Sequence, residues 1–357
     1  MSGLVASKPV ESGAFDSKRM DARHLDSAGS VSRSRFAVHS GLIAKYVSGC
    51  WLLWAACGLA MFAFAWVRVW VVSLLDMSQF QSVLEQFRQY ERFAPIDFDS
   101  LLTYTGRVGM TYDEPIIIFC TVIWCVARGS DVVAGELNRG TMEMILAQPI
   151  RRSTLLNSHA LVSVLGLAGL CLLVWLGIAI GIQVTAVTES GVAPSLKIPF
   201  LNWEIPIGSP PDEKTIVPLR ERVDAMVFLP ATVNLFAFGF FLLGLSSLLS
   251  SIDRYRWRAI GMVIGIYVCQ LVLYGLGKAA GSLQWLLSTS FFSCYKAQKM
   301  TSLVHQEGFA AIFRMDRPLA DGMLPPLIYP LLLIAMGAGF YAAAKYLFEK
   351  RDLPAPL

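Results

Sequence analysis

Six apolar runs, separated by polar segments, limit how this chain can fold more than any other feature of its sequence. A helix needs about 20 apolar residues to cross roughly 30 Å of hydrocarbon, and within lipid it satisfies its own backbone hydrogen bonds. Only 16% of the 357 residues are charged, against roughly a quarter in soluble domains. The sequence therefore predicts an all-α polytopic membrane protein with six transmembrane helices, at about 49–75, 114–138, 155–187, 226–250, 257–277 and 326–346.

The second of these helices has the shortest apolar run. Only 13 residues, Pro115–Ala127, precede Arg128, so the helix must continue through Asp131 to about Asn138 in order to cross. Arg128 and Asp131 are three apart and can pair. A lone charge that faces lipid costs about 2.5–3.5 kcal/mol, so the pair is expected at the inner boundary or facing protein. We favour an Arg128 that extends toward the interface over one that contacts substrate.

Basic residues set the expected orientation. Arg254, Arg256 and Arg258 crowd the short connection between the fourth and fifth helices, and Lys345 and Lys350 lie at the end of the sixth. Because short connections rich in Lys and Arg stay inside, both termini are expected in the cytoplasm of a multi-pass protein of the cell membrane, the inner or plasma membrane in a bacterium. The outer loops are then 76–113, 188–225 and 278–323.

The N-terminal region precedes a transmembrane domain expected over 31–350. Residues 1–30 are rich in Ser, Asp and Ala without periodicity, which predicts a disordered cytoplasmic tail. In "SRSRFAVHSGLIAKYV" the apolar Phe36, Ile43 and Val47 recur at helical spacing among basic residues. This pattern predicts a basic amphipathic helix that lies in the inner headgroup plane, with an ordinary tail as the alternative.

The outer loops are long enough to hold structure. Apolar residues at i, i+3, i+4 and i+7 predict an amphipathic helix over 78–93 that ends near Pro95. The proline-rich loop 188–225 is expected to be irregular. The apolar segment "LQWLLSTSFF" (283–292) is half the length of a span and predicts a short interfacial or re-entrant helix.

The segment "VVAGELNRGTMEMILAQP" (132–149) is charged although it lies between two apolar helices. Glu136 and Arg139 are three apart, and Arg139 and Glu143 are four apart. On a helix these spacings bring opposite charges together. We therefore expect a helix here with one charged face.

A glycine in the middle of this segment indicates a sharp turn. Gly140 can end the first helix in a left-handed conformation, and Thr141 can then cap a second short helix, "MEMILA". Pro149 ends it. The segment is thus predicted to be a helix, a turn and a short helix on the cytoplasmic side, where a soluble partner could bind.

Residues 129–156, "GSDVVAGELNRGTMEMILAQPIRRSTLL", resemble the segment after the second span of type 2 ABC exporter permeases. A second stretch, "GLSSLLSSIDRYRWRAIG" (244–261), is similar to that family's small-residue span end and basic turn. Asn157 and Ser158 depart from a Gly-Lys that is common at the third span, and the outer loops are longer than in compact members. The family pattern falls on Glu136, Gly140, Thr141, Met142 (for Leu), Glu143, Ile145, Leu146, Pro149, Ile150 and Arg152.

The resemblance implies an exporter permease driven by a separate ABC ATPase in two copies, which docks on 131–149. It also implies a second permease subunit, identical or related, in the lipid bilayer, and no nucleic acid partner. The chain has no G-x-x-x-x-G-K-[ST] phosphate loop, so it is expected to bind no cofactor, with ATP and magnesium in the ATPase. The substrate is unknown; because no span holds several charges, lipid-like or amphipathic cargo is favoured. The expected coupling residues are Glu136, Arg139, Gly140, Thr141, Glu143 and Pro149.

Two other classes stay open: an intramembrane enzyme and a passive membrane anchor of a larger assembly. The sequence has neither H-E-x-x-H nor G-x-S-x-G. His159, at the start of the third helix, is expected to be packed or interfacial rather than a general base. The seven cysteines form no C-x-x-C pair, which favours small buried side chains over metal ligands.

Overall fold

Six helices in the described part of the chain are long and apolar enough to cross a membrane. They span Ser40–Leu74, Tyr104–Asn138, Arg152–Val184, Ala225–Ile252, Arg256–Ala279 and Ile328–Lys350. The computed structural model describes residues 40–74, 102–148, 151–190, 195–198, 203–206, 214–319 and 324–351. The prediction of an all-α polytopic membrane protein with six spans is confirmed. The predicted tail 1–30 and the helix at 78–93 lie outside the described residues.

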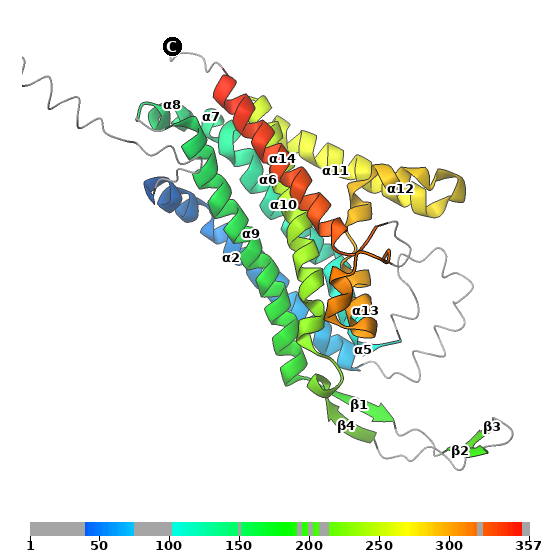
Figure 1. The fold of residues 1–357 in the computed structure, drawn as a ribbon. Coiled ribbons are helices and arrows are strands. Elements are labelled where there is room, and N and C mark those ends of the chain that lie inside the picture. Colours follow the sequence, from blue (N-terminus) through cyan, green and yellow to red (C-terminus); the bar gives the residue numbers. More distant parts are fainter. Residues whose placement is uncertain are drawn as a thin grey trace, which may run out of the picture. The chain divides into compact units, whose positions relative to one another are not determined.

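The long helices form a bundle around α10 (Figure 1). Helices α2 and α9 run side by side, α10 lies between α9 and α14, and α6 packs behind α10, whereas α11 leans away from the others. The end of the bundle with α7, α8 and the end of α14, at the top of Figure 1, is named here the knob end. The bounds are α2 Ser40–Leu74, α6 Pro115–Ser130, α9 Arg152–Val184, α10 Leu229–Ile252, α11 Arg256–Ala279 and α14 Ile328–Lys350.

Small residues let α10 approach two neighbours closely. A Cβ added to Gly129 of α6 would lie 2.4 Å from Cβ of Ser246, and one added to Gly244 would lie 2.4 Å from the carbonyl oxygen of Gly337 in α14. Real Cβ atoms do not come this close to other heavy atoms. Packing of this kind is how membrane helices associate without a hydrophobic driving force, so α10 is the central helix of the bundle.

The second span continues past Arg128, as the sequence requires. After α6 the chain makes a π-helical turn, η3 (Asp131–Gly135), and one further helical turn, α7 (Glu136–Asn138). The span also begins earlier than predicted, with α5 (Tyr104–Gly109) and the 3₁₀ turn η2 (Met110–Asp113). The sequence assigns these residues to an outer loop because their apolar content is low.

The start of α2 takes up part of the predicted amphipathic helix. Ser40 onward belongs to the continuous helix α2, with Leu42 and Tyr46 buried and Val47 exposed. Within the described residues there is thus no separate helix before the first span. Residues 31–39 lie outside them.

Two small β-ladders occupy the loop that was predicted to be irregular. Strand β1 (Ala186–Ser190) pairs antiparallel with β4 (Lys214–Pro218), and β2 (Ser195–Ile198) pairs antiparallel with β3 (Trp203–Pro206). Val187 lies opposite Val217 in the first ladder. The strands are only four or five residues long, which is too short for alternation to be visible among the prolines.

The loop before α14 holds the predicted short helix and more. Helix α12 lies within 283–292, and the rings of Phe291 and Phe292 stack at 4.6 Å in the core. The sequence did not predict α13, which is more polar and covers α5 and α10. The turn η5 Ala225–Phe228 begins the fourth span. Short elements outside the six spans are η4 Leu219–Glu221, η6 Gly281–Leu283, α12 Trp285–Thr289, η7 Phe291–Cys294, α13 Ala297–Glu307 and η8 Phe309–Phe313.

Candidate functional site

A left-handed glycine divides the linking segment, the name used here for residues 131–148 between α6 and α9. Gly140 has φ 70° and ψ 4°, and α8 (Thr141–Leu146) follows it. The predicted left-handed turn at Gly140 is confirmed. The predicted cap is wrong: Gly140 itself is the N-cap of α8, and the hydroxyl of Thr141 donates to the Glu136 carboxylate instead. Pro149 lies outside the described residues.

The carboxylate of Glu136 points into the protein rather than toward solvent. The residue is 1% exposed, and Nζ of Lys45 in α2 lies 2.8 and 2.9 Å from its two oxygens. Arg139 Nη2 lies 3.3 Å from Oε1, as the spacing predicts. A buried carboxylate needs such partners, because burying an unpaired charge costs several kcal/mol, to order of magnitude. Glu136 is therefore an internal anchor of the linking segment.

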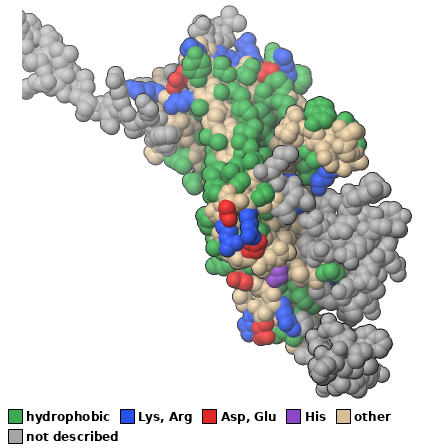
Figure 2. All heavy atoms as spheres, turned by 45° about the vertical axis from the view of Figure 1, so that its right-hand side comes forward, with side chains coloured by type: hydrophobic (Ala, Val, Ile, Leu, Met, Phe, Trp, Pro, Cys, Tyr) green, Lys and Arg blue, Asp and Glu red, His purple; other side chains and the backbone are tan. Residues whose placement is uncertain are grey.

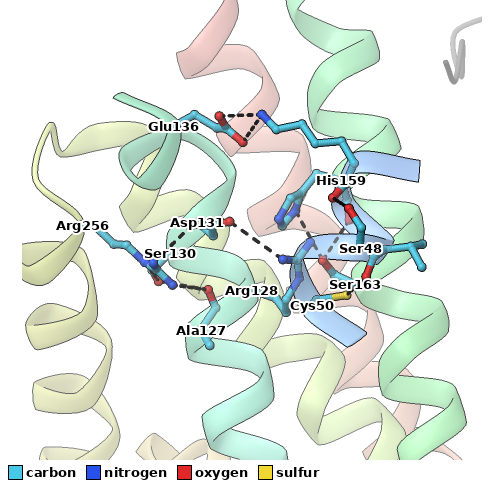
Figure 3. Close-up of polar contacts among 12 residues, drawn as sticks. Ser48, Cys50, Ala127, Arg128, Ser130, Asp131, Glu136, His159, Ser163 and Arg256 are labelled. Atoms are coloured by element: carbon cyan, nitrogen blue, oxygen red, sulfur yellow. Dashed lines mark hydrogen bonds and ion pairs between the residues drawn. The ribbon is translucent and has the colours of Figure 1, made fainter. Parts of the chain in front are cut away.

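A second carboxylate, Asp131, pairs with three arginines, of which Figure 3 labels Arg128 and Arg256. Its Oδ1 lies 2.7 Å from Nη1 of Arg139 and 3.4 Å from Nη1 of Arg256 in α11, and its Oδ2 lies 3.8 Å from Nη1 of Arg128. The hydrogen bond to Asp131 raises the pKa of Arg139. Arg139 thus pairs with two residues that precede it, and the predicted pair with the exposed Glu143 is not formed.

Arg128 faces the interior of the bundle. It is 5% exposed, and Figure 3 places it beneath Asp131 near Cys50 and His159. Our prediction that Arg128 extends to the interface is wrong, because the helix turns this side chain toward α2 and α9. Its pair with Asp131, also predicted, is present at 3.8 Å.

Ser250 of α10 holds the π-helical turn. A π turn breaks the α-helical hydrogen-bond series and frees backbone groups. The Ser250 hydroxyl accepts from the backbone N–H of Val133 at 3.3 Å and of Ala134 at 3.0 Å, and it donates to the carbonyl of Ser130 at 3.0 Å. One side chain thereby satisfies three backbone groups and fixes the start of the linking segment on the central helix.

The outer face of the linking segment is exposed. Met142 and Ile145 are buried and anchor α8, whereas Met144 is 73% exposed and the Arg139 side chain is 43% exposed. Glu143 is exposed between them. Figure 2 shows hydrophobic side chains over the long helices and charged ones gathered at the knob end and again toward the other end. The linking segment therefore presents a small surface with an arginine, a glutamate and a methionine.

The histidine at the start of the third span lies in the core. His159 is fully buried, and its ring meets that of Tyr46 edge-on at 4.9 Å, as predicted for a packed histidine. All seven cysteines are free. Among the residues that the structure describes, no three His, Cys, Asp or Glu side chains group as metal ligands do.

The sequence did not predict four residues that hold the linking segment in place: Lys45, Asp131 as a shared acceptor, Arg256 and Ser250. Lys45 and Ser250 lie 91 and about 117 residues from their partners. In the sequence, Arg256 indicates only the orientation of the chain, as one of the basic residues expected on the cytoplasmic side. The spacing of Asp131 and Glu136 gave no signal, because residues five apart do not face each other on a regular α-helix.

Comparison with known proteins found a family match that covers the linking segment. Residues 51–207 match the family model described as ABC-2 family transporter protein. The matched residues include α6, the linking segment and α9. No curated protein matches the chain. The chain is therefore a multi-pass membrane protein whose residues 51–207 are similar to the permease domain of ABC-2 family transporters.

Proposed function

We propose that this permease is the transmembrane subunit of an exporter driven by a separate ABC ATPase, which docks on the linking segment. The observation that carries the proposal is the left-handed turn at Gly140, which presents α8 beyond the bundle with Met144 exposed and Met142 buried. ABC-2 permeases generally work with an ATPase subunit. ATP and magnesium bind the ATPase, so the knob end is cytoplasmic, together with the start of α2 and the end of α14.

The residues of the linking segment divide into two roles. Arg139, Glu143 and Met144 form the contact surface, where exposed charges set register and encounter more than raw affinity. The turn at Gly140 sets the direction in which this surface faces. The buried Glu136, which accepts a hydrogen bond from Thr141, fixes the segment on its inner side. We therefore expect the ATPase to touch Arg139 and Glu143, and Glu136 to act without touching it. Pro149 stays a predicted end of the segment.

Movement of the ATPase reaches the membrane through covalent and packed connections. The linking segment joins α6 to α9, and Ser250 ties its beginning to α10. When ATP draws two ATPase subunits together, a segment fixed in this way transfers the displacement to these helices. Two ATPases need two docking segments, so a second permease, identical or related, completes the transporter.

Site-specific photo-crosslinking tests the docking. A photoreactive residue replaces Met144 in the full chain, expressed in its native membrane, and the matched control replaces Met226 in η5, which is also a methionine and 55% exposed. We expect Met144 to capture a nucleotide-binding protein that mass spectrometry identifies, and Met226 not to. Native mass spectrometry of the complex should then give two permease chains and two ATPases.

Other outcomes separate the alternatives. Repeated failure of the Met144 probe to capture an ATPase, with the protein intact, contradicts the proposal. Activity of the purified chain without nucleotide would indicate an intramembrane enzyme. Neither activity nor ATPase, but a stable larger assembly, would indicate a membrane anchor.

A further inference from the structure

Two cations from distant helices reach the base of the linking segment. Lys45 comes from the first turns of α2 and holds Glu136. Arg256 begins α11 and holds Asp131, and it also donates to the carbonyl of Ala127 at 3.3 Å. Neither helix is joined to the linking segment along the chain. These contacts therefore add direct ionic connections between the segment and two helices that otherwise reach it through packing alone.

Arg139 joins the two carboxylates to each other. Its Nη1 lies 2.7 Å from Asp131 and its Nη2 lies 3.3 Å from Glu136. A guanidinium is planar and presents donors in a fixed fork, so one side chain can hold two acids in a set geometry. Five charges thus form one continuous series, Lys45, Glu136, Arg139, Asp131 and Arg256, and Arg128 of α6 joins it at Asp131.

The acids of this series are shielded from water. The side chain of Glu136 is 1% exposed and that of Asp131 is 13% exposed. Charge pairs in such surroundings are screened far less than surface pairs, and removing one partner leaves an uncompensated buried carboxylate. The three cations are more exposed, at 43%, 43% and 35% for Lys45, Arg139 and Arg256. The two buried carboxylates are therefore held in place, and the three more exposed cations bind to them.

We propose that Lys45 and Arg256 are positioning residues of the linking segment, and that the five-charge series makes α2 and α11 follow the segment when it moves. This inference rests on the proposed docking of an ATPase, which supplies the movement. Lys45 carries the displacement to α2 through Glu136. Arg256 carries it to α11 through Asp131, and Arg139 keeps the two branches together.

Distances between pairs of spin labels, measured by pulsed electron paramagnetic resonance, test the inference in the permease–ATPase complex with and without a non-hydrolysable ATP analogue. Labels carried by non-natural residues avoid the native cysteines. One label replaces the exposed Gln148 of the linking segment. The other replaces Val47 (α2 distance), Trp257 (α11 distance) or Met226 (reference distance), all exposed. The reference distance reports whether the segment moves at all.

In the native chain we expect the reference distance to shift with nucleotide while the α2 and α11 distances stay fixed. Lys45→Gln should make the α2 distance nucleotide-dependent and leave the α11 distance fixed, and Arg256→Gln should do the reverse. Lys45→Arg, which keeps the charge, should restore the native result. The matched control is Arg258→Gln, which removes an ion pair with Asp253 (3.3 Å) on the same helix outside the series.

The inference is overturned if Lys45→Gln and Arg256→Gln leave both distances fixed while the reference distance still shifts. It is also overturned if Arg258→Gln has the same effect as Arg256→Gln, or if Lys45→Arg behaves like Lys45→Gln. Co-purification of the ATPase checks that each variant is folded. A native chain that binds no ATPase, or a reference distance that never shifts, refutes the proposed function itself.

Discussion

Helices α10 and α11 follow each other in the chain and are equally apolar, yet their surroundings are opposite. The most apolar window of each span has a mean hydropathy of 2.0, but 67% of that window is buried in the span of α10 and 17% in α11. Gly244 of α10 touches the backbone of α14, whereas an added Cβ at Gly261 or Gly265 of α11 meets nothing within 4 Å. Hydropathy thus identifies a span without saying what the span faces.

Small and hydroxyl residues carry the information that hydropathy lacks. Ser246, Ser247 and Ser250 are fully buried on α10, and two of them bond to the backbone of the second span. In contrast, α11 exposes a broad aliphatic surface. Its exposed side chains include Met262, Ile264, Ile266, Val268, Leu271, Val272 and Leu276.

The largest expected effect comes from filling the contact between α10 and α14. Gly244→Leu places a side chain where backbone already lies, 2.4 Å from a Cβ position, and overpacking of a rigid contact costs about 3 kcal/mol or more. Gly261→Leu, on open α11, should change stability by less than about 0.5 kcal/mol. Thermal unfolding in detergent, followed by size-exclusion fluorescence, compares them. Equal stability of the two variants would show that α10 is not packed more tightly than α11.

The hydroxyls of α10 can be tested singly. Ser250→Ala removes the partner of three backbone groups at the π turn and should cost about 1–3 kcal/mol. Ser251→Ala removes a hydroxyl that bonds only within its own helix and should cost less. Hydrogen exchange at Val133 and Ala134 should speed up in the first variant alone. Unchanged exchange there would show that Ser250 does not hold the turn.

Gly140 is a third kind of glycine, because it has open space but an unusual backbone. An added Cβ meets nothing within 4 Å, yet φ is 70°, so only conformation opposes a side chain. Gly140→Val should cost about 1 kcal/mol or more and reduce ATPase co-purification with all six spans inserted. Gly140→Asn, which tolerates left-handed geometry, should keep binding. Parental binding by the valine variant would mean that the turn does not direct α8.

The smallest effect is expected on the open face of α11. Val272→Ala removes a side chain that is 54% exposed, so the folded subunit should lose less than about 0.5 kcal/mol. Native mass spectrometry of the same variant measures the fraction of permease chains that are paired. A smaller fraction of paired permeases would show that a subunit, rather than lipid, covers this face.

Features of the sequence that depend on neighbouring residues were predictable. The six spans follow from run length, and the left-handed Gly140 follows from a glycine between two helical patterns. The burial of Glu136 was not predictable, because it depends on Lys45, which is 91 residues away. The sequence does not distinguish a carboxylate that is exposed to water from one that pairs with a cation far away along the chain. The direction of Arg128 was missed for the same reason, since it depends on how the helix rotates.

The direction of Glu136 relative to α6 is set by the π-helical turn at Asp131–Gly135. A π turn holds one residue more than an α-helical course through the same space, and each residue turns an α-helix by about 100° because 3.6 residues complete a turn. Every side chain after the turn, Glu136 included, is therefore rotated relative to α6 by that amount. Deleting a single codon within the turn would leave the six spans intact and swing Glu136 away from Lys45. The number of residues in the π turn therefore sets the direction in which the side chains of the linking segment point.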